Sequence, residues 1–316
     1  MSNLIFLLIG FIPLIYGANF LVDGSSSLAK KFNIPNIVIG LTVVAFGTSA
    51  PELIVNVFSS LQKTSDITMG NIIGSNIFNI AVILGVTSVL KNLNVKTSTT
   101  WKEIPMALLA VVLVVIMIND VTIDKNKISE LSRIDGMVLI SFFIIFLSYT
   151  LSIVKSGKSE EKIEIKEYTV LKSSMLTILG FAMLVIGGKV IVIFAVKLAK
   201  SMGISERIIG LTIVSMGTSL PELATSISAA LKNNVDIAIG NVVGSNIFNI
   251  LFILGISSII YPIPLLEGVN LDITLNISLN FLLFLFVFSG KGRKIERWEG
   301  IFFIMIYIIY LAYLIY

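Results

Sequence analysis

The stretch GLTVVAFGTSAPEL at residues 40–53, followed by DITMGNIIGSNIFNI at residues 66–80, occurs twice in this chain. It returns as GLTIVSMGTSLPEL at residues 210–223 and DIAIGNVVGSNIFNI at residues 236–250, with each residue 170 positions after its counterpart. The shared residues concentrate on Gly, Thr, Ser, Pro, Glu and Asn, although both copies lie in apolar surroundings. A duplication that retains its polar residues indicates a functional site.

The composition predicts an integral membrane protein. Hydrophobic residues make up 56% of the 316 residues and charged residues only 13%, and the mean hydropathy is +0.98. A typical soluble domain is about a quarter charged. Several apolar runs reach the roughly 20 residues that a membrane-spanning helix needs, and the first, Leu4–Val22, lacks the basic start and cleavage site of a signal peptide. We therefore expect the lipid bilayer to be this chain's environment and the first run to remain as a spanning helix.

The spacing of the apolar runs predicts an all-α membrane protein of ten transmembrane helices. Five precede the polar stretch around residues 155–170 and five follow it, so we expect a first repeat at 1–154, a linker at 155–170 and a second repeat at 171–316. Because five is odd, the second repeat enters the bilayer from the opposite side, which makes an inverted-topology pair. The expected helices are 3–28, 34–61, 67–90, 103–119, 134–154, 171–198, 205–231, 237–260, 270–289 and 298–316.

Basic residues predict the orientation of these helices. Loops on one side hold fifteen Lys and Arg, including those of the linker, and loops on the other hold seven. Short cytoplasmic loops carry the excess of positive charge, so the linker is predicted cytoplasmic and both termini external, in the cell (inner) membrane. The basic residues form no stripe suited to nucleic acid, and no nucleic-acid partner or obligate protein partner is implied.

Each copy of the motif interrupts an apolar helix with a proline and places a glutamate directly after it. Pro51 and Pro221 lack the N–H that would bond the carbonyl four residues earlier, so the carbonyls of Gly47 and Gly217 are freed. A broken helix at membrane depth is typical of an ion site. Glutamates inside a membrane are costly and usually functional, so Glu52 and Glu222 are the leading candidates.

The second half of each copy adds a polar stripe along one helix face. Its members follow at intervals of four, and glycines beside them predict close approach to a neighbouring helix: Asn71, Ser75 and Asn79 with Gly70 and Gly74, then Asn241, Ser245 and Asn249 with Gly240 and Gly244. Carboxylate, hydroxyl, amide and carbonyl oxygens suit Ca²⁺ and Na⁺. The chain has no cysteine and no histidine, which removes the usual ligands of softer metals.

GTSAPEL with GNIIGSNIFNI, and GTSLPEL with GNVVGSNIFNI, resemble the paired repeats of the calcium/cation antiporter superfamily, which includes the prokaryotic sodium/calcium exchangers. The resemblance extends over nearly the whole chain. It implies that Ca²⁺ and Na⁺ are the transported substrates, bound alternately in one central cluster, with no cofactor. It also implies that the first and sixth helices slide across a fixed core. Carried over by motif position, the implied ligands are Glu52, Thr48, Ser49, Ser75, Asn79, Glu222, Thr218, Ser219, Ser245 and Asn249, with backbone carbonyls around Ala45 and Ser215.

The sequence is also compatible with two other functions. A Ca²⁺/H⁺ antiporter would protonate Glu52 and Glu222 in exchange for Ca²⁺, and a passive cation channel would need no second coupled ion. Some relatives carry aspartate at the positions of Asn79 and Asn249, and in potassium-dependent members that acid is linked to K⁺. The two amides therefore argue against K⁺ dependence. Nothing resembles a nucleotide-binding loop or an activated nucleophile, so no enzyme activity is expected.

Overall fold

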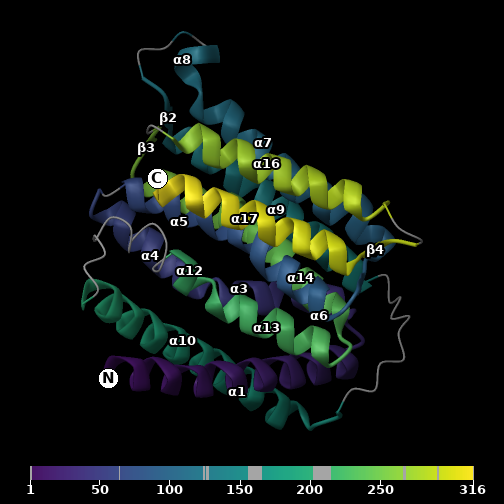
Figure 1. Ribbon diagram of the computed structural model, residues 1–316. Helices are drawn as coiled ribbons and strands as arrows, with labels where there is room; N and C mark the ends of the chain where they lie inside the picture. Colours follow the sequence, from purple (N-terminus) through teal and green to yellow (C-terminus); the bar gives the residue numbers. More distant parts are fainter. Residues whose placement is uncertain are drawn as a thin grey trace.

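The computed structural model describes residues 2–63, 65–123, 125, 128–155, 166–201, 215–265, 268–289 and 292–315. Helices dominate these residues (Figure 1). In the first half they are α1 (Ser2–Lys31), α2 (Asn36–Ile39), α3 (Ala45–Thr48), α4 (Ala50–Leu61), α5 (Ser65–Phe78), α6 (Gly85–Leu90), α7 (Ile104–Ile118), α8 (Asp120–Ile123) and α9 (Arg133–Lys155). In the second half they are α10 (Val170–Ser201), α12 (Ser215–Thr218), α13 (Leu220–Leu231), α14 (Val235–Ile247), α15 (Gly255–Ile260), α16 (Val269–Phe286) and α17 (Arg297–Ile315).

Wider π-helical turns join several of these helices without ending the span. They are η1 (Gly40–Val44), η2 (Asn79–Leu84), η3 (Thr99–Glu103) and η5 (Phe248–Leu254). Such turns are rare and occur frequently at functional sites. Here η2 begins at Asn79 and η5 includes Asn249, so both predicted amide ligands lie in π-helical backbone.

Eight described helices are long and apolar enough to cross a membrane, and a ninth candidate is a bent pair. The bent pair comprises Asn36–Thr48 and Ala50–Leu61, which meet at 49° where the first motif has its proline. The break in the predicted helix 34–61 is thus confirmed. The predicted helix 205–231 begins in residues outside the described part, and α12 and α13 form its described end. Most of the predicted linker, residues 156–165, also lies outside the described residues.

Four short loop segments, for which the sequence predicted no structure, form two antiparallel ladders. Strand β1 (Leu93–Asn94) pairs with β4 (Lys294–Ile295), and β2 (Glu130–Leu131) pairs with β3 (Ile263–Pro264). Each ladder joins a loop of the first half to a loop of the second. Because backbone groups near the protein interior need hydrogen-bond partners, these loops satisfy one another where no helix can.

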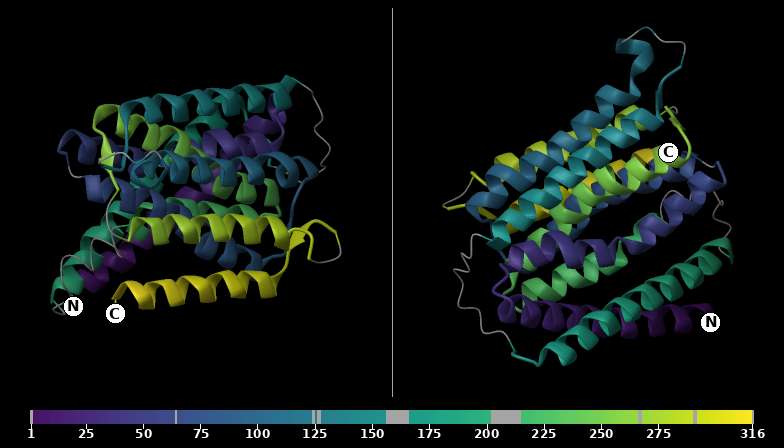
Figure 2. Two further views of the ribbon diagram at one scale, coloured as in Figure 1. Left: turned by 90° about the horizontal axis from the view of Figure 1, so that it is seen from above. Right: turned by 180° about the vertical axis from the view of Figure 1, so that it is seen from behind.

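The helices stack in layers that place the motif helices at the centre. Helices α1 and α10 pack against each other along one side of the molecule, and α3, α4, α12 and α13 follow them (Figures 1 and 2). Beyond these lie α5 and α14, with α17, α16, α7 and α9 on the opposite side. Helices α5 and α14, with the turns that continue them, are the most buried spans, at 78% each.

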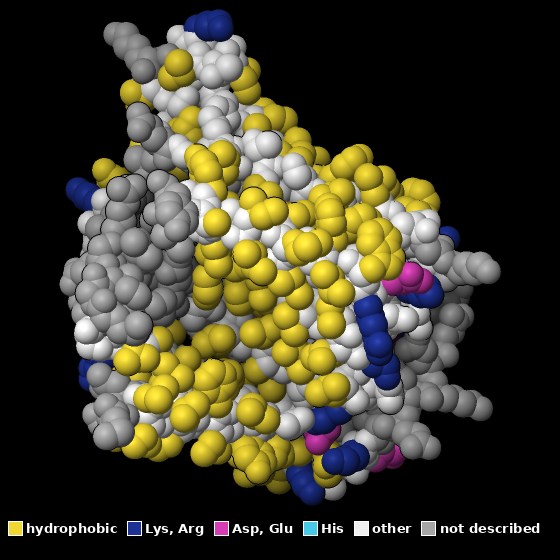
Figure 3. Space-filling view, in the orientation of Figure 1, with side chains coloured by type: hydrophobic (Ala, Val, Ile, Leu, Met, Phe, Trp, Pro, Cys, Tyr) yellow, Lys and Arg dark blue, Asp and Glu magenta, His cyan; other side chains and the backbone are white. Residues whose placement is uncertain are grey.

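The outer surface is apolar, as a bilayer requires. Large hydrophobic side chains such as Ile134, Leu171 and Ile309 are about 70% exposed, and yellow side chains cover the middle of the face in Figure 3. Charged side chains in that view gather towards its edges. Trp101 and Trp298 are exposed and pack on phenylalanines of α16, and tryptophan is enriched where a membrane protein meets the lipid headgroups. This distribution supports a multi-pass integral membrane protein.

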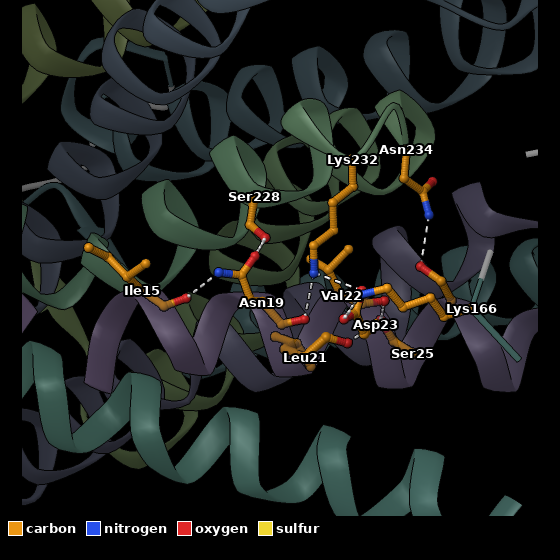
Figure 4. A network of polar contacts seen from close by, with 11 residues as sticks. Ile15, Asn19, Leu21, Val22, Asp23, Ser25, Lys166, Ser228, Lys232 and Asn234 are labelled. Atoms are coloured by element: carbon orange, nitrogen blue, oxygen red, sulfur yellow. Dashed lines mark hydrogen bonds and ion pairs between the residues drawn. The ribbon is translucent and has the colours of Figure 1, made fainter. Parts of the chain in front are cut away.

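A polar network ties the second half of α1 to the C-terminal end of α13 (Figure 4). The Lys232 ammonium donates to the Asn19 carbonyl at 2.8 Å and to the Asp23 carboxylate at 2.7 Å. The Ser228 hydroxyl donates to the Asn19 amide oxygen at 2.8 Å. Asp23, which follows an apolar run in the sequence, is therefore engaged in helix packing at this end.

Candidate cation site

The two motif glutamates lie in the first turns of equivalent helices and are almost fully buried. Glu52 is the third residue of α4 and Glu222 the third residue of α13, and each is 1% exposed. Ser49 and Ser219, three residues before the glutamates, occupy the N-cap positions with non-helical backbone. The proline after each cap fits the first turn, where no intrahelical N–H bond is needed. The broken helix thus directs a carboxylate into the core beside a positive helix end.

The two capping serines do not cap their own helices. The Ser49 hydroxyl donates to Glu222 Oε1 at 2.9 Å, and the Ser219 hydroxyl donates to Glu52 Oε1 at 3.0 Å. Each bond therefore joins one repeat to the other. The Ser49 and Ser245 hydroxyls are also 3.1 Å apart. Both glutamates and three of the predicted serine ligands consequently belong to one cluster.

The two predicted threonine ligands also form hydrogen bonds between the repeats. The Thr48 hydroxyl donates to Asn241 Oδ1 at 3.0 Å, and the Thr218 hydroxyl donates to Asn71 Oδ1 at 3.2 Å. The turn η2, with Asn79, packs against α13, while η5, with Asn249, packs against α4. Each amide ligand thus lies on an element that touches the glutamate helix of the other repeat.

Several oxygens of this cluster are buried without any hydrogen-bond partner. They are Glu52 Oε2, Glu222 Oε2, Asn79 Oδ1, Asn249 Oδ1 and the Ser75 hydroxyl. Among the described residues no lysine or arginine is ion-paired to either glutamate. Buried acceptors and charges are costly unless a donor or a cation meets them. These buried oxygens are therefore suited to bind a hard cation that has lost its water.

The backbone carbonyls at the two breaks accept hydrogen bonds from the residues that follow them. The Ala45 carbonyl accepts the Ser49 N–H at 3.0 Å and the Thr48 hydroxyl at 3.3 Å. In the second repeat the Ser219 N–H bonds the Met216 carbonyl at 3.2 Å.

In the described part of the chain, no three or more acidic, histidine or cysteine side chains lie close enough together to hold a metal ion. A cation here would be held by two carboxylates and by neutral oxygens, which is a set that suits Ca²⁺ and Na⁺. The close approach expected of the stripe glycines occurs in the second repeat, where a Cβ on Gly240 would be 3.0 Å from the Cα of Gly40. For Gly70 the equivalent partner would be Gly210, which lies outside the described residues, so the expectation there stays a prediction.

Comparison with known proteins identifies the family. The sequence profile described as "Sodium/calcium exchanger protein" matches residues 2–152 and 172–316. This chain belongs to the sodium/calcium exchanger family. The sodium/calcium exchanger MaX1 of Methanosarcina acetivorans is 31% identical, over 99% of both chains. The human sodium/potassium/calcium exchanger 1 is 34% identical over 39% of this chain and 12% of its own length.

Solved structures of a sodium/calcium exchanger agree with the fold. The exchanger NCX_Mj soaked with 10 mM Na⁺ and 10 mM Sr²⁺ is 37% identical, with a TM-score of 0.84 over 98% of this chain and 97% of its own. The same exchanger soaked with 10 mM Na⁺ and no Ca²⁺ gives a TM-score of 0.82. The family is one of membrane transporters, and membership in it supports antiport of cations that include Ca²⁺.

Two buried residues of this site were not singled out by the sequence. Asn76 and Asn246 hydrogen-bond to the predicted amide ligands. The polar stripe at intervals of four residues does not include them. A signal for them existed, because Asn76 and Asn246 also recur 170 residues apart within apolar helices.

Proposed function

We propose that this protein is a secondary antiporter that exchanges Ca²⁺ for Na⁺ by alternating access at the cluster described above. The observation that carries the proposal is the pair of buried glutamates, each bonded to a serine of the opposite repeat and each with one oxygen unmet. Two carboxylates neutralise one Ca²⁺ or are shared by Na⁺ ions. Competition for the same oxygens then couples the two fluxes.

The proposed ligands are the ten motif side chains together with the carbonyls at Ala45 and Ser215. The hydrogen bonds between repeats and the orphaned acceptor oxygens support this set. An empty cluster holds two buried carboxylates without a counter-ion, and this makes occlusion without an ion unfavourable. Uncoupled leak is thereby reduced.

The proposed architecture is ten membrane spans in two inverted repeats, 1–154 and 171–316, joined by a cytoplasmic linker with external termini. The protein lies in the cell (inner) membrane. Helices α1 and α10 are the proposed moving pair. Their support is that they pack on each other along one side of the molecule, while the most buried spans, α5 and α14, carry the polar stripes.

The test is Ca²⁺ uptake into proteoliposomes loaded with Na⁺, compared with vesicles that contain K⁺ or choline at equal ionic strength. We expect uptake only with internal Na⁺. A third set of vesicles carries a proton gradient without Na⁺. Equal uptake in that set would replace the proposal with Ca²⁺/H⁺ antiport, and uptake that needs no counter-ion would replace it with a channel.

A further inference from the structure

Two buried asparagines lie behind the proposed ligands at equivalent positions of the two repeats. Asn76 belongs to α5 and Asn246 to α14, and they are 0% and 3% exposed. Each is three residues before the amide ligand of its own repeat, Asn79 or Asn249. Neither belongs to the proposed ligand set.

These asparagines bind the amide ligands in a crossed arrangement. Asn79 Nδ2 donates to Asn246 Oδ1 at 2.9 Å, and Asn249 Nδ2 donates to Asn76 Oδ1 at 3.0 Å. Asn76 Nδ2 in turn donates to the Asn246 carbonyl at 3.1 Å, which fixes the orientation of the Asn76 amide. The amide ligand of each repeat is therefore held by the other repeat.

The consequence concerns which end of each amide remains available. A side-chain amide has an NH₂ group that donates hydrogen bonds and an oxygen that accepts them, and only the oxygen can bind a cation. The donor ends of Asn79 and Asn249 are occupied, whereas their Oδ1 atoms are buried without a partner. Rotation of either amide by half a turn would present its NH₂ group to the cation and its oxygen to another oxygen.

We infer that Asn76 and Asn246 are positioning residues that hold the amides of Asn249 and Asn79 with their oxygens towards the transported cation. The inference rests on the proposed function, because it assigns a role around the same site. Partners that orient metal ligands typically change metal affinity by about 10- to 100-fold when they are removed. The orientation is imposed across the repeats, so it also couples the two halves of the site.

A double-mutant cycle distinguishes orientation from simple packing. Asn246→Ala removes the acceptor that holds the Asn79 amide, and we expect the half-saturating Ca²⁺ concentration to rise by about tenfold or more. Asn79→Asp replaces the amide with a carboxylate, which has two acceptor oxygens and no NH₂ group that could face the cation. In that background Asn246→Ala should change the Ca²⁺ affinity by less than about twofold. The difference between the effects of Asn246→Ala in the two backgrounds then measures the coupling between the two asparagines.

The mirrored cycle uses Asn76→Ala with Asn249→Asp and should give the same pattern. Asn280→Ala is the matched control, because Asn280 is 1% exposed but bonds only to Asn276 of its own helix α16 among the described contacts. Should Asn246→Ala fail to fold, Asn246→Leu fills the volume without an acceptor. Ca²⁺-dependent thermal shifts of the purified protein provide a second readout of affinity.

An equal loss of affinity in both backgrounds would overturn the inference in favour of packing, and so would an unchanged affinity in Asn246→Ala. Glu52→Gln separates this failure from failure of the proposed function. If Glu52→Gln abolishes Ca²⁺ transport while Asn246→Ala keeps the native Ca²⁺ affinity, the proposed cation site stands and the orienting role of Asn246 is refuted. Full transport in Glu52→Gln would instead remove the site itself, and the inference with it.

Discussion

The chemistry of single residues is concentrated at Glu52 and Glu222. Glu52→Gln or Glu222→Gln removes half of the negative charge of the cluster, so we expect Ca²⁺ transport to fall below about 1% of the native rate, as buried charge partners of several kcal/mol imply. The measurement is ⁴⁵Ca²⁺ uptake by proteoliposomes that contain equal amounts of folded protein. The matched control is Glu103→Gln, since Glu103 is 0% exposed and accepts a hydrogen bond from Tyr149, which is not a proposed ligand. Near-native uptake in either cluster variant would show that the carboxylates are not ligands.

At the scale of elements, the contact between α1 and α10 depends on missing side chains. A Cβ on Gly180 would lie 2.6 Å from the Leu21 backbone nitrogen and 2.8 Å from the Gly17 carbonyl oxygen. Backbone atoms cannot turn aside, so Gly180→Ala forces the two helices apart. Overpacking of this kind costs about 1–3 kcal/mol, and we expect a lower Tm in detergent.

Gly188→Ala is the control for that measurement because it lies on the same helix. Its added Cβ would be 3.7 Å from Pro221, which is an ordinary contact. The Tm should then stay constant or rise slightly, since alanine favours helix by about 1 kcal/mol over glycine. If the two variants lowered the Tm equally, the close crossing would not be what stabilises the pair.

At the scale of the whole molecule, the proposed inverted topology predicts which side of the membrane each loop faces. The chain contains no cysteine, so single cysteines report position without background. Lys166→Cys, before α10, and Lys125→Cys, between α8 and β2, replace exposed residues and should react with an impermeant maleimide from opposite sides of intact vesicles. Labelling of both from the same side would contradict the orientation inferred from the basic residues.

The sequence by itself determined the apolar spans, the duplication, the proline breaks and the polar residues that follow them. These features are local: hydropathy fixes a span, and a proline removes one N–H whatever surrounds it. Only the tertiary structure decided the partners, such as Ser49 with Glu222 instead of its neighbour Glu52, and Asn79 with Asn246. Periodicity shows which face of a helix is polar, but bonds between residues 167 to 173 positions apart depend on how the spans pack.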